Sequence, residues 1–194
     1  MNQWKYSPFF FLFFFVACSG KDSASSDETA FFPVLSFLKS QVAHIDTSVY
    51  TITQVTRRGS EMDTAYVKRE DFEKTAHDFL SIPDITAKKL RKKYTESRLY
   101  DETLGKVVIT YTPTDENLEI IRQDVIIQPG TGSGDQVETI YIERLLNDDD
   151  STVQKKMTWE VNKGFQIRSI IQKENTPERV ENVAVTWSLH HSAE

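Results

Sequence analysis

The feature that most constrains the fold is an alternation of apolar and polar residues in the C-terminal half of the chain. Met157, Trp159 and Val161 alternate with Lys156, Thr158 and Glu160. Successive side chains of a β-strand point to opposite faces of the sheet, so this spacing predicts a strand with one buried and one solvated face. Similar patterns predict strands at 107–111, 118–120, 125–127, 137–145, 165–171 and 183–187.

Short turn sequences separate these strands, at 129–135, 147–151 and 162–164. Their Gly, Asn, Asp and Ser residues are typical of hairpin connections, and strands joined by such turns pair in antiparallel fashion. One strand departs from the alternation, because Ile170 and Ile171 are both apolar. This departure predicts either a β-bulge or a strand buried on both faces.

The N-terminal part of the chain shows helical periodicity instead. Between residues 31 and 46 the apolar residues are spaced three or four apart, which predicts a helix with one apolar face. That face consists of Phe31, Leu35, Leu38, Val42 and Ile45. It could pack on the core or lie on a membrane. Lys39 is the one cation on the polar face, which favours packing on the core.

A strand at 49–58 and helices at 69–81 and 84–94 complete the expected elements. Together they predict an α+β fold, in which two or three N-terminal helices pack on a curved antiparallel β-meander of about six or seven strands. Residues 31–194 are enough for one domain of this kind.

The first residues of the chain have the organisation of an export signal. Lys5 precedes an apolar run from Phe9 to Ala17, which is too short to span a bilayer, since a helix needs about 20 residues for that. The run ends in Phe15-Val16-Ala17-Cys18, which resembles the lipobox of bacterial lipoproteins. The resemblance implies a signal peptide at 1–17 and a lipid anchor on Cys18. The alternatives are a plain signal cleaved after Ala17 and a buried free thiol at Cys18.

Residues 18–30 are small and polar, which predicts a flexible tether. Lys21-Asp22 resembles the charged tract that follows the cysteine in Bacteroidota lipoproteins. The tether and anchor together predict a protein held on the membrane of a bacterial cell envelope. We expect the outer membrane, facing either the periplasm or the cell surface.

Composition excludes several classes of function. The formal net charge of −6 is unfavourable for nucleic-acid binding, which needs a basic surface. Cys18 is the single cysteine of the chain, so neither a disulfide framework nor a cysteine metal site is expected. The one basic cluster lies at 88–93. It could attract anionic headgroups, but a solvated helix face is the simpler interpretation.

No segment predicts a catalytic, cofactor or metal site. The glycine-rich loop at 130–134 lacks the Gly-Lys-Ser/Thr ending of a phosphate-binding loop, and the contiguous acids at 147–150 lack the spacing of a calcium loop. His190 and His191 are neighbours and would point to opposite sides of an extended segment, so they are not expected to bind one metal ion together. His44 and His77 belong to no recognisable motif. We therefore expect no enzyme activity, no cofactor and no metal ion.

Four aromatic residues of the strands, Tyr141, Trp159, Phe165 and Trp187, have two interpretations. They could line a ligand groove on the concave face of the sheet, although aromatic residues at strand spacing more often belong to the core.

Three short segments, at 79–85, 154–159 and 164–167, resemble uncharacterised lipoproteins of the Bacteroidota, notably the Chitinophagaceae. This resemblance implies an envelope location and no particular activity. The leading hypothesis is a non-enzymatic interaction or structural module with an envelope protein as partner. The alternative is a carrier or sensor of a lipid or other apolar ligand. A hydrolase that uses His44 or His77 is the third hypothesis.

Overall fold

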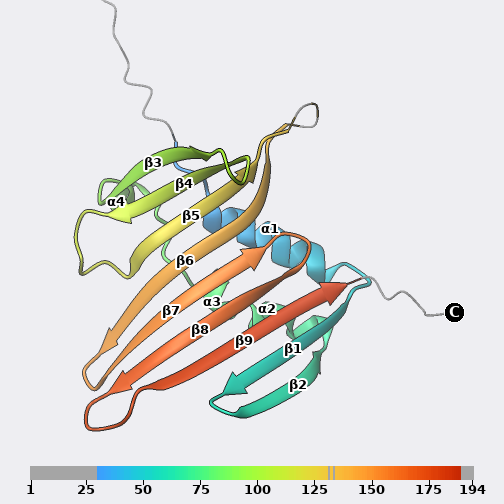
Figure 1. Ribbon diagram of the computed structural model, residues 1–194, viewed down its shortest axis with the longest axis vertical. Helices are drawn as coiled ribbons and strands as arrows, with labels where there is room; N and C mark the ends of the chain where they lie inside the picture. Colours follow the sequence, from blue (N-terminus) through green and yellow to red (C-terminus); the bar gives the residue numbers. More distant parts are fainter. Residues whose placement is uncertain (1–29, 131, 133, 189–194) are drawn as a thin grey trace, which may run out of the picture.

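The computed structural model describes residues 30–130, 132 and 134–188, and the strands among them form a single antiparallel sheet. Nine strands lie side by side in the order β2-β1-β9-β8-β7-β6-β5-β4-β3 (Figure 1). The strands are β1 (Thr51–Arg58), β2 (Glu61–Val67), β3 (Tyr94–Asp101), β4 (Lys106–Pro113), β5 (Ile120–Gln128), β6 (Gln136–Asp148), β7 (Ser151–Glu160), β8 (Gly164–Lys173) and β9 (Arg179–Ser188).

This topology combines a meander with an added hairpin. Strands β3 to β9 follow one another across the sheet, and the hairpin β1–β2 joins them because β1 pairs with β9. The sheet therefore ends in two edge strands, β2 and β3, that are far apart in space (Figure 1).

The helical segments gather on one face of this sheet (Figure 1). The longest, α1 (Val34–Asp46), buries Val34, Leu38, Val42 and Ile45. The last three belong to the predicted apolar face, whereas Phe31 and Leu35 of that face are half-buried. The others are single turns: η1 (Arg69–Asp71), α2 (Phe72–Thr75), α3 (His77–Leu80) and α4 (Lys88–Arg91). Within the described residues, no helix is long and apolar enough to cross a membrane.

The predicted number of strands was wrong. The sequence predicts six or seven, because the patterns at 118–120 and 125–127 correspond to one strand, β5, and the sheet has nine because β2 and β3 were missed. Both are edge strands with mostly exposed residues, so they lack the alternation that marks a half-buried strand. The antiparallel pairing itself is confirmed, and the three predicted turns connect β5 to β6, β6 to β7 and β7 to β8.

The predicted packing of two or three helices on the sheet was also wrong, because α1 is the one helix of several turns among the described residues. The expected helix at 69–81 breaks at Ala76, where ψ is 6°. Its apolar residues Phe72, Ala76 and Phe79 are buried nevertheless, so contacts with the sheet replace the stability of a continuous helix.

The expected helix at 84–94 shortens to α4 for a local reason. Asp84 Oδ1 accepts hydrogen bonds from the N–H and the hydroxyl of Thr86, at 3.0 and 2.7 Å. This Asx turn satisfies the backbone outside a helix, and Ala87 is extended with ψ of 136°. The segment from Tyr94 onward pairs with β4 instead.

The predicted β-bulge at Ile170 and Ile171 is absent from the described β8, whose register with β7 and β9 is continuous through both residues. Both side chains are half-buried, one on each face, which agrees with the alternative interpretation. The register of the sheet shifts in β5 instead, where its pairing with β6 is irregular between Ile120 and Arg122 and between Ile126 and Ile127.

Aromatic side chains form the centre of the core between the helices and the sheet. Trp159 stacks on Phe165 with ring centroids 5.3 Å apart, and Trp187 lies 5.3 Å from Trp159. Phe72 and Phe79 approach this group edge-on from α2 and α3. Such edge-to-face contacts are favourable beyond the area that they bury.

A buried arginine fastens the segment 77–81 to the sheet. Arg144 of β6 donates through Nε to Glu119 Oε1 at 2.9 Å and through Nη1 to the carbonyl oxygen of Asp78 at 2.9 Å. The same Nη1 lies 3.2 Å from Ser81 Oγ. Nearby, Lys155 Nζ is 2.6 Å from Asp78 Oδ1. A single guanidinium thus holds three groups from outside its own strand.

Candidate functional site on the uncovered face of the sheet

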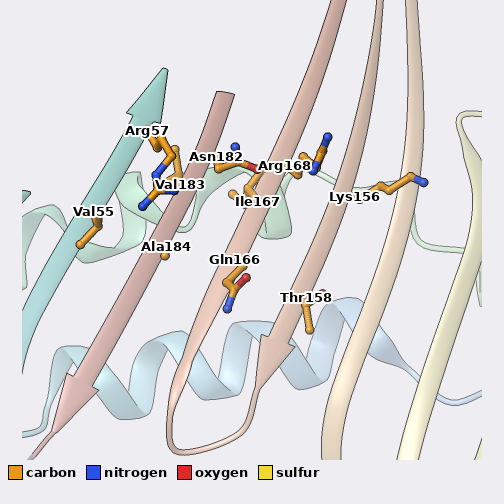
Figure 2. Close-up of a pocket in the computed structure, with 10 residues that line it drawn as sticks. All are labelled: Val55, Arg57, Lys156, Thr158, Gln166, Ile167, Arg168, Asn182, Val183 and Ala184. Carbon is orange, nitrogen blue, oxygen red and sulfur yellow. The ribbon is translucent and has the colours of Figure 1, made fainter. Parts of the chain in front are cut away.

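The second face of the sheet carries the candidate site. The helices lie behind the sheet in Figure 2, and the side chains in front of it point away from them. Because strand residues alternate between faces, each strand that gives Trp159, Phe165 or Val185 to the core presents the intervening residues on this open side.

The strand register aligns four polar side chains in a row across the sheet, and three of them are long cations. Arg57 of β1 is opposite Asn182 of β9, which is opposite Arg168 of β8, and Arg168 is opposite Lys156 of β7. Figure 2 shows these side chains side by side at one level of the four strands. We call this set, Arg57, Asn182, Arg168 and Lys156, the cationic row.

A second row of side chains, none of them charged, lies next to it, two residues along each strand. Val55, Ala184, Gln166 and Thr158 are aligned by the same pairings. A groove of about 480 Å³, open to solvent, lies over these two rows, and its lining includes all eight of their residues. The groove therefore has the cationic row on one side and the uncharged row on the other (Figure 2).

The positive charges of this groove are only partly compensated. Among the described residues, no carboxylate lies within 4 Å of the guanidinium of Arg57 or Arg168. The Nη2 atom of Arg57 instead lies 3.7 Å from Met62 Sδ. Lys156 Nζ is 3.6 Å from Glu143 Oε1, and that oxygen also accepts a hydrogen bond of 2.6 Å from Gln154. Two arginines are thus available to an incoming anion.

An ordered polar network borders the groove beyond Lys156. Tyr141 donates to Glu143 Oε2 at 3.3 Å, and Arg122 Nε lies 3.0 and 2.9 Å from the two oxygens of Asp124. Burial, followed by the nearby charge of Glu143, raises the pKa of Tyr141 above its ordinary value, so this hydroxyl stays protonated. The polar groups of this network pair with one another, whereas Arg57 and Arg168 have no carboxylate partner among the described residues.

The groove provides the donors of an anion-binding surface. Guanidinium groups bind carboxylates through two parallel hydrogen bonds, and the side-chain amides of Asn182 and Gln166 add neutral donors between the charges. Thr158 is the one hydroxyl of the lining, and no histidine or carboxylate stands beside it there. This chemistry suits binding of an anionic group and offers no nucleophile with an adjacent base.

The residues considered from the sequence do not meet in this groove. Cys18, His190 and His191 lie outside the described residues. His44 lies on α1 with its ring 6.3 Å from that of Tyr50, and His77 is exposed at the start of α3. No group of three or more metal-ligating side chains occurs within the described part of the chain.

The four aromatic residues divide between the two faces. Trp159, Phe165 and Trp187 are buried in the core, while Tyr141 belongs to the network on the open face. Three of the four aromatic residues therefore belong to the core between the helices and the sheet. They do not line a ligand groove there.

Sequence reasoning missed the groove because its residues are the polar members of alternating strands. Such residues ordinarily face water and carry no signal of function. The one available signal was the coincidence of Arg57, Lys156 and Arg168 on well-predicted strands. Converting it into a site requires the order of the strands, which places β1 next to β9.

No family model, curated protein or solved structure was found to match this chain.

Proposed function

We propose that this protein is a bacterial envelope lipoprotein, anchored through Cys18, whose domain is a non-enzymatic interaction module. The uncovered face of the sheet binds an envelope protein, and the groove receives an acidic segment of that partner. The uncompensated charge of Arg57 and Arg168 carries this proposal, because two guanidinium groups without a carboxylate partner among the described residues share one groove in a chain of net charge −6.

The spacing of the charges suits an extended acidic segment. Arg57 and Arg168 are separated by β9, and neighbouring strands lie about 4.8 Å apart, so the two strands that carry them are roughly 10 Å apart. In a polyproline II conformation, which has three residues per turn and a rise of about 3.1 Å per residue, carboxylates three residues apart lie on one side of the chain, roughly 9 Å from each other. One segment could therefore engage both guanidinium groups at once.

The apolar-ligand alternative has less support. A carrier needs an enclosed apolar cavity, and the space between the helices and the sheet is filled by the side chains of Phe72, Phe79, Trp159, Phe165 and Trp187. The groove on the open face is lined by charged and amide groups, which an apolar ligand would leave unpaired.

The first prediction concerns the affinity of the groove. In the double variant Arg57→Gln, Arg168→Gln we expect the affinity for fluorescein-labelled poly-L-glutamate to fall about tenfold, because two charge-assisted contacts are lost. Fluorescence anisotropy measures this change. The wild-type affinity should also decrease as salt is raised, since both arginines are exposed.

The matched control removes two cations from the basic cluster at 88–93. Lys89→Gln, Lys92→Gln changes the net charge by the same amount, and both residues are exposed outside the groove. We expect a change of less than about twofold, as for distant, screened charges. Equal losses in the two double variants would show that only the overall charge matters and would contradict binding in the groove.

The second prediction concerns the anchor. Cys18→Ala removes the thiol that acylation requires, and acyl chains provide the membrane affinity of a lipoprotein. We expect the variant to move from the membrane fraction to the soluble fraction after cell lysis, with its folded domain intact by circular dichroism. An unchanged membrane fraction would refute the anchor and leave the groove proposal standing.

A further inference from the structure

The edge strand β2 is the most exposed strand of the sheet. Residues 61–66 are all exposed, and β2 pairs on one side only, with β1. Met62 and Tyr66 point to the same face as each other and are 63% and 82% exposed. An edge strand with free backbone groups and exposed apolar side chains is a template for another strand.

The hairpin determines which backbone groups of β2 are free. The closing pair is Arg58 and Glu61, on either side of the two-residue turn Gly59-Ser60, where Gly59 has φ of +60°. In a two-residue hairpin the closing pair exchanges both hydrogen bonds, and such pairs then alternate along the ladder. The N–H and C=O groups of Met62, Thr64 and Tyr66 therefore point outward.

We propose that β2 pairs with β2 of a second copy of this chain, antiparallel about a two-fold axis at Thr64. In this register Thr64 is opposite Thr64 of the other copy, and Met62 is opposite Tyr66 twice. These three positions are the ones with outward backbone groups, so the ladder continues directly from one sheet to the other. Each exposed Tyr66 ring gains a methionine as its cross-strand neighbour, a favourable contact.

Charge complementarity supports an antiparallel arrangement in this register. β2 begins with Glu61 and is followed by Lys68 and Arg69, so antiparallel pairing sets the acidic end of each strand beside the basic end of the other. Lys68 holds only a weak pair with Glu70, at 3.8 Å with both side chains exposed.

The neighbouring registers that match the outward groups are less favourable. A shift in one direction sets Asp63 directly opposite Asp63 of the other copy, which repels. A shift in the other direction separates Met62 from Tyr66 and leaves Ala65 opposite Ala65. The Thr64-centred register alone of these three pairs both large apolar side chains.

Cysteine cross-linking tests this proposal in the full-length protein in membranes. Thr64→Cys places two thiols across the two-fold axis, at the Cα separation of about 5.5 Å that a disulfide accepts. After mild oxidation we expect a covalent dimer at a yield at least fivefold above that of Thr95→Cys, an exposed threonine on the other edge strand, β3. The yield of covalent dimer in the wild-type protein, whose one cysteine is Cys18, shows how much Cys18 contributes to cross-linking.

A register test sharpens the result. Met62→Cys and Tyr66→Cys proteins should cross-link when co-expressed and stay monomeric when expressed singly, because two copies of either position lie about 14 Å apart along the paired strands. Equal yields at Thr64 and Thr95, efficient single cross-linking at Met62, or cross-links from Thr64 to an unrelated polypeptide would each overturn the proposal.

Thr64→Pro provides a second measurement that does not use thiols. The substitution removes only an outward N–H, which proline lacks, so pairing with β1 is retained. We expect wild-type dimers in sedimentation velocity at high concentration and a several-fold larger dissociation constant for Thr64→Pro, with an unchanged circular dichroism spectrum. A wild-type protein that is monomeric up to about 1 mM would overturn the proposal.

Discussion

Replacing Trp159 with alanine is expected to lower the free energy of unfolding by about 3–5 kcal/mol, the range measured for large aromatic residues in cores. Its indole is fully buried and packs against three rings whose centroids lie 5.3 Å away, those of Phe79, Phe165 and Trp187. Truncation would leave a cavity that these rings cannot fill without giving up their own contacts. Urea denaturation followed by far-ultraviolet circular dichroism measures the loss.

Trp159→Phe is the matched control, because the indole nitrogen of Trp159 has no hydrogen-bond partner among the described residues. Phenylalanine keeps most of the aromatic surface and removes this unpaired N–H, so we expect a loss below about 1.5 kcal/mol. A loss below about 1 kcal/mol for Trp159→Ala would contradict the core assignment and return Trp159 to the lining of a ligand cavity.

Replacing Arg144 with alanine is expected to destabilise the protein by about 2–3 kcal/mol. The arginine side chain is 7% exposed, and its loss leaves Glu119, the carbonyl of Asp78 and the hydroxyl of Ser81 without their donor. Because Glu119 is 34% exposed, water stabilises its carboxylate in part, so the effect stays below that of a fully buried pair.

Arg168→Ala is the control for this change, since Arg168 is also a strand arginine but is exposed and unpaired within the described residues. We expect its unfolding free energy to stay within about 0.5 kcal/mol of wild type. Hydrogen exchange should also show faster exchange of the amides at 77–81 in the Arg144 variant. Equal stabilities for the two variants would contradict the role of Arg144 in fastening this segment.

The central strands and α1 could be predicted from the sequence because each of these elements packs one face on the core and turns the other towards solvent. In α1 the apolar residues repeat with the helical period, and in β7 they alternate around Trp159. The turn at 162–164 was equally clear, and Asn162 adopts φ of +62°, which asparagine tolerates better than most residues.

The edge strands and the broken helices could not be predicted in the same way. β2 is exposed on both faces, so its pairing with β1 is stabilised by backbone hydrogen bonds that leave no hydrophobic pattern. The apolar spacing of Phe72, Ala76 and Phe79 is helical, yet the chain bends between α2 and α3 and still buries all three. Tertiary contacts here override the local pattern.

The candidate site depended on contacts between strands that are distant in sequence. Arg57 and Asn182 are 125 positions apart and become cross-strand neighbours because β1 joins the sheet at β9. Local periodicity predicts which residues of a strand share a face, but it does not give the order of the strands. The charges of the groove were therefore visible in the sequence, while their assembly was not.

In-cell photo-cross-linking tests most directly whether the uncovered face binds a partner. A photoreactive amino acid at Gln166, in the groove beside the cationic row, is compared with the same residue at Lys74, which is exposed on α2. We expect one discrete cross-linked product from position 166, lost when Arg57 and Arg168 are both changed to glutamine, and none from position 74. No product at 166, or the same products at both positions, would contradict the proposal that this face is the binding surface.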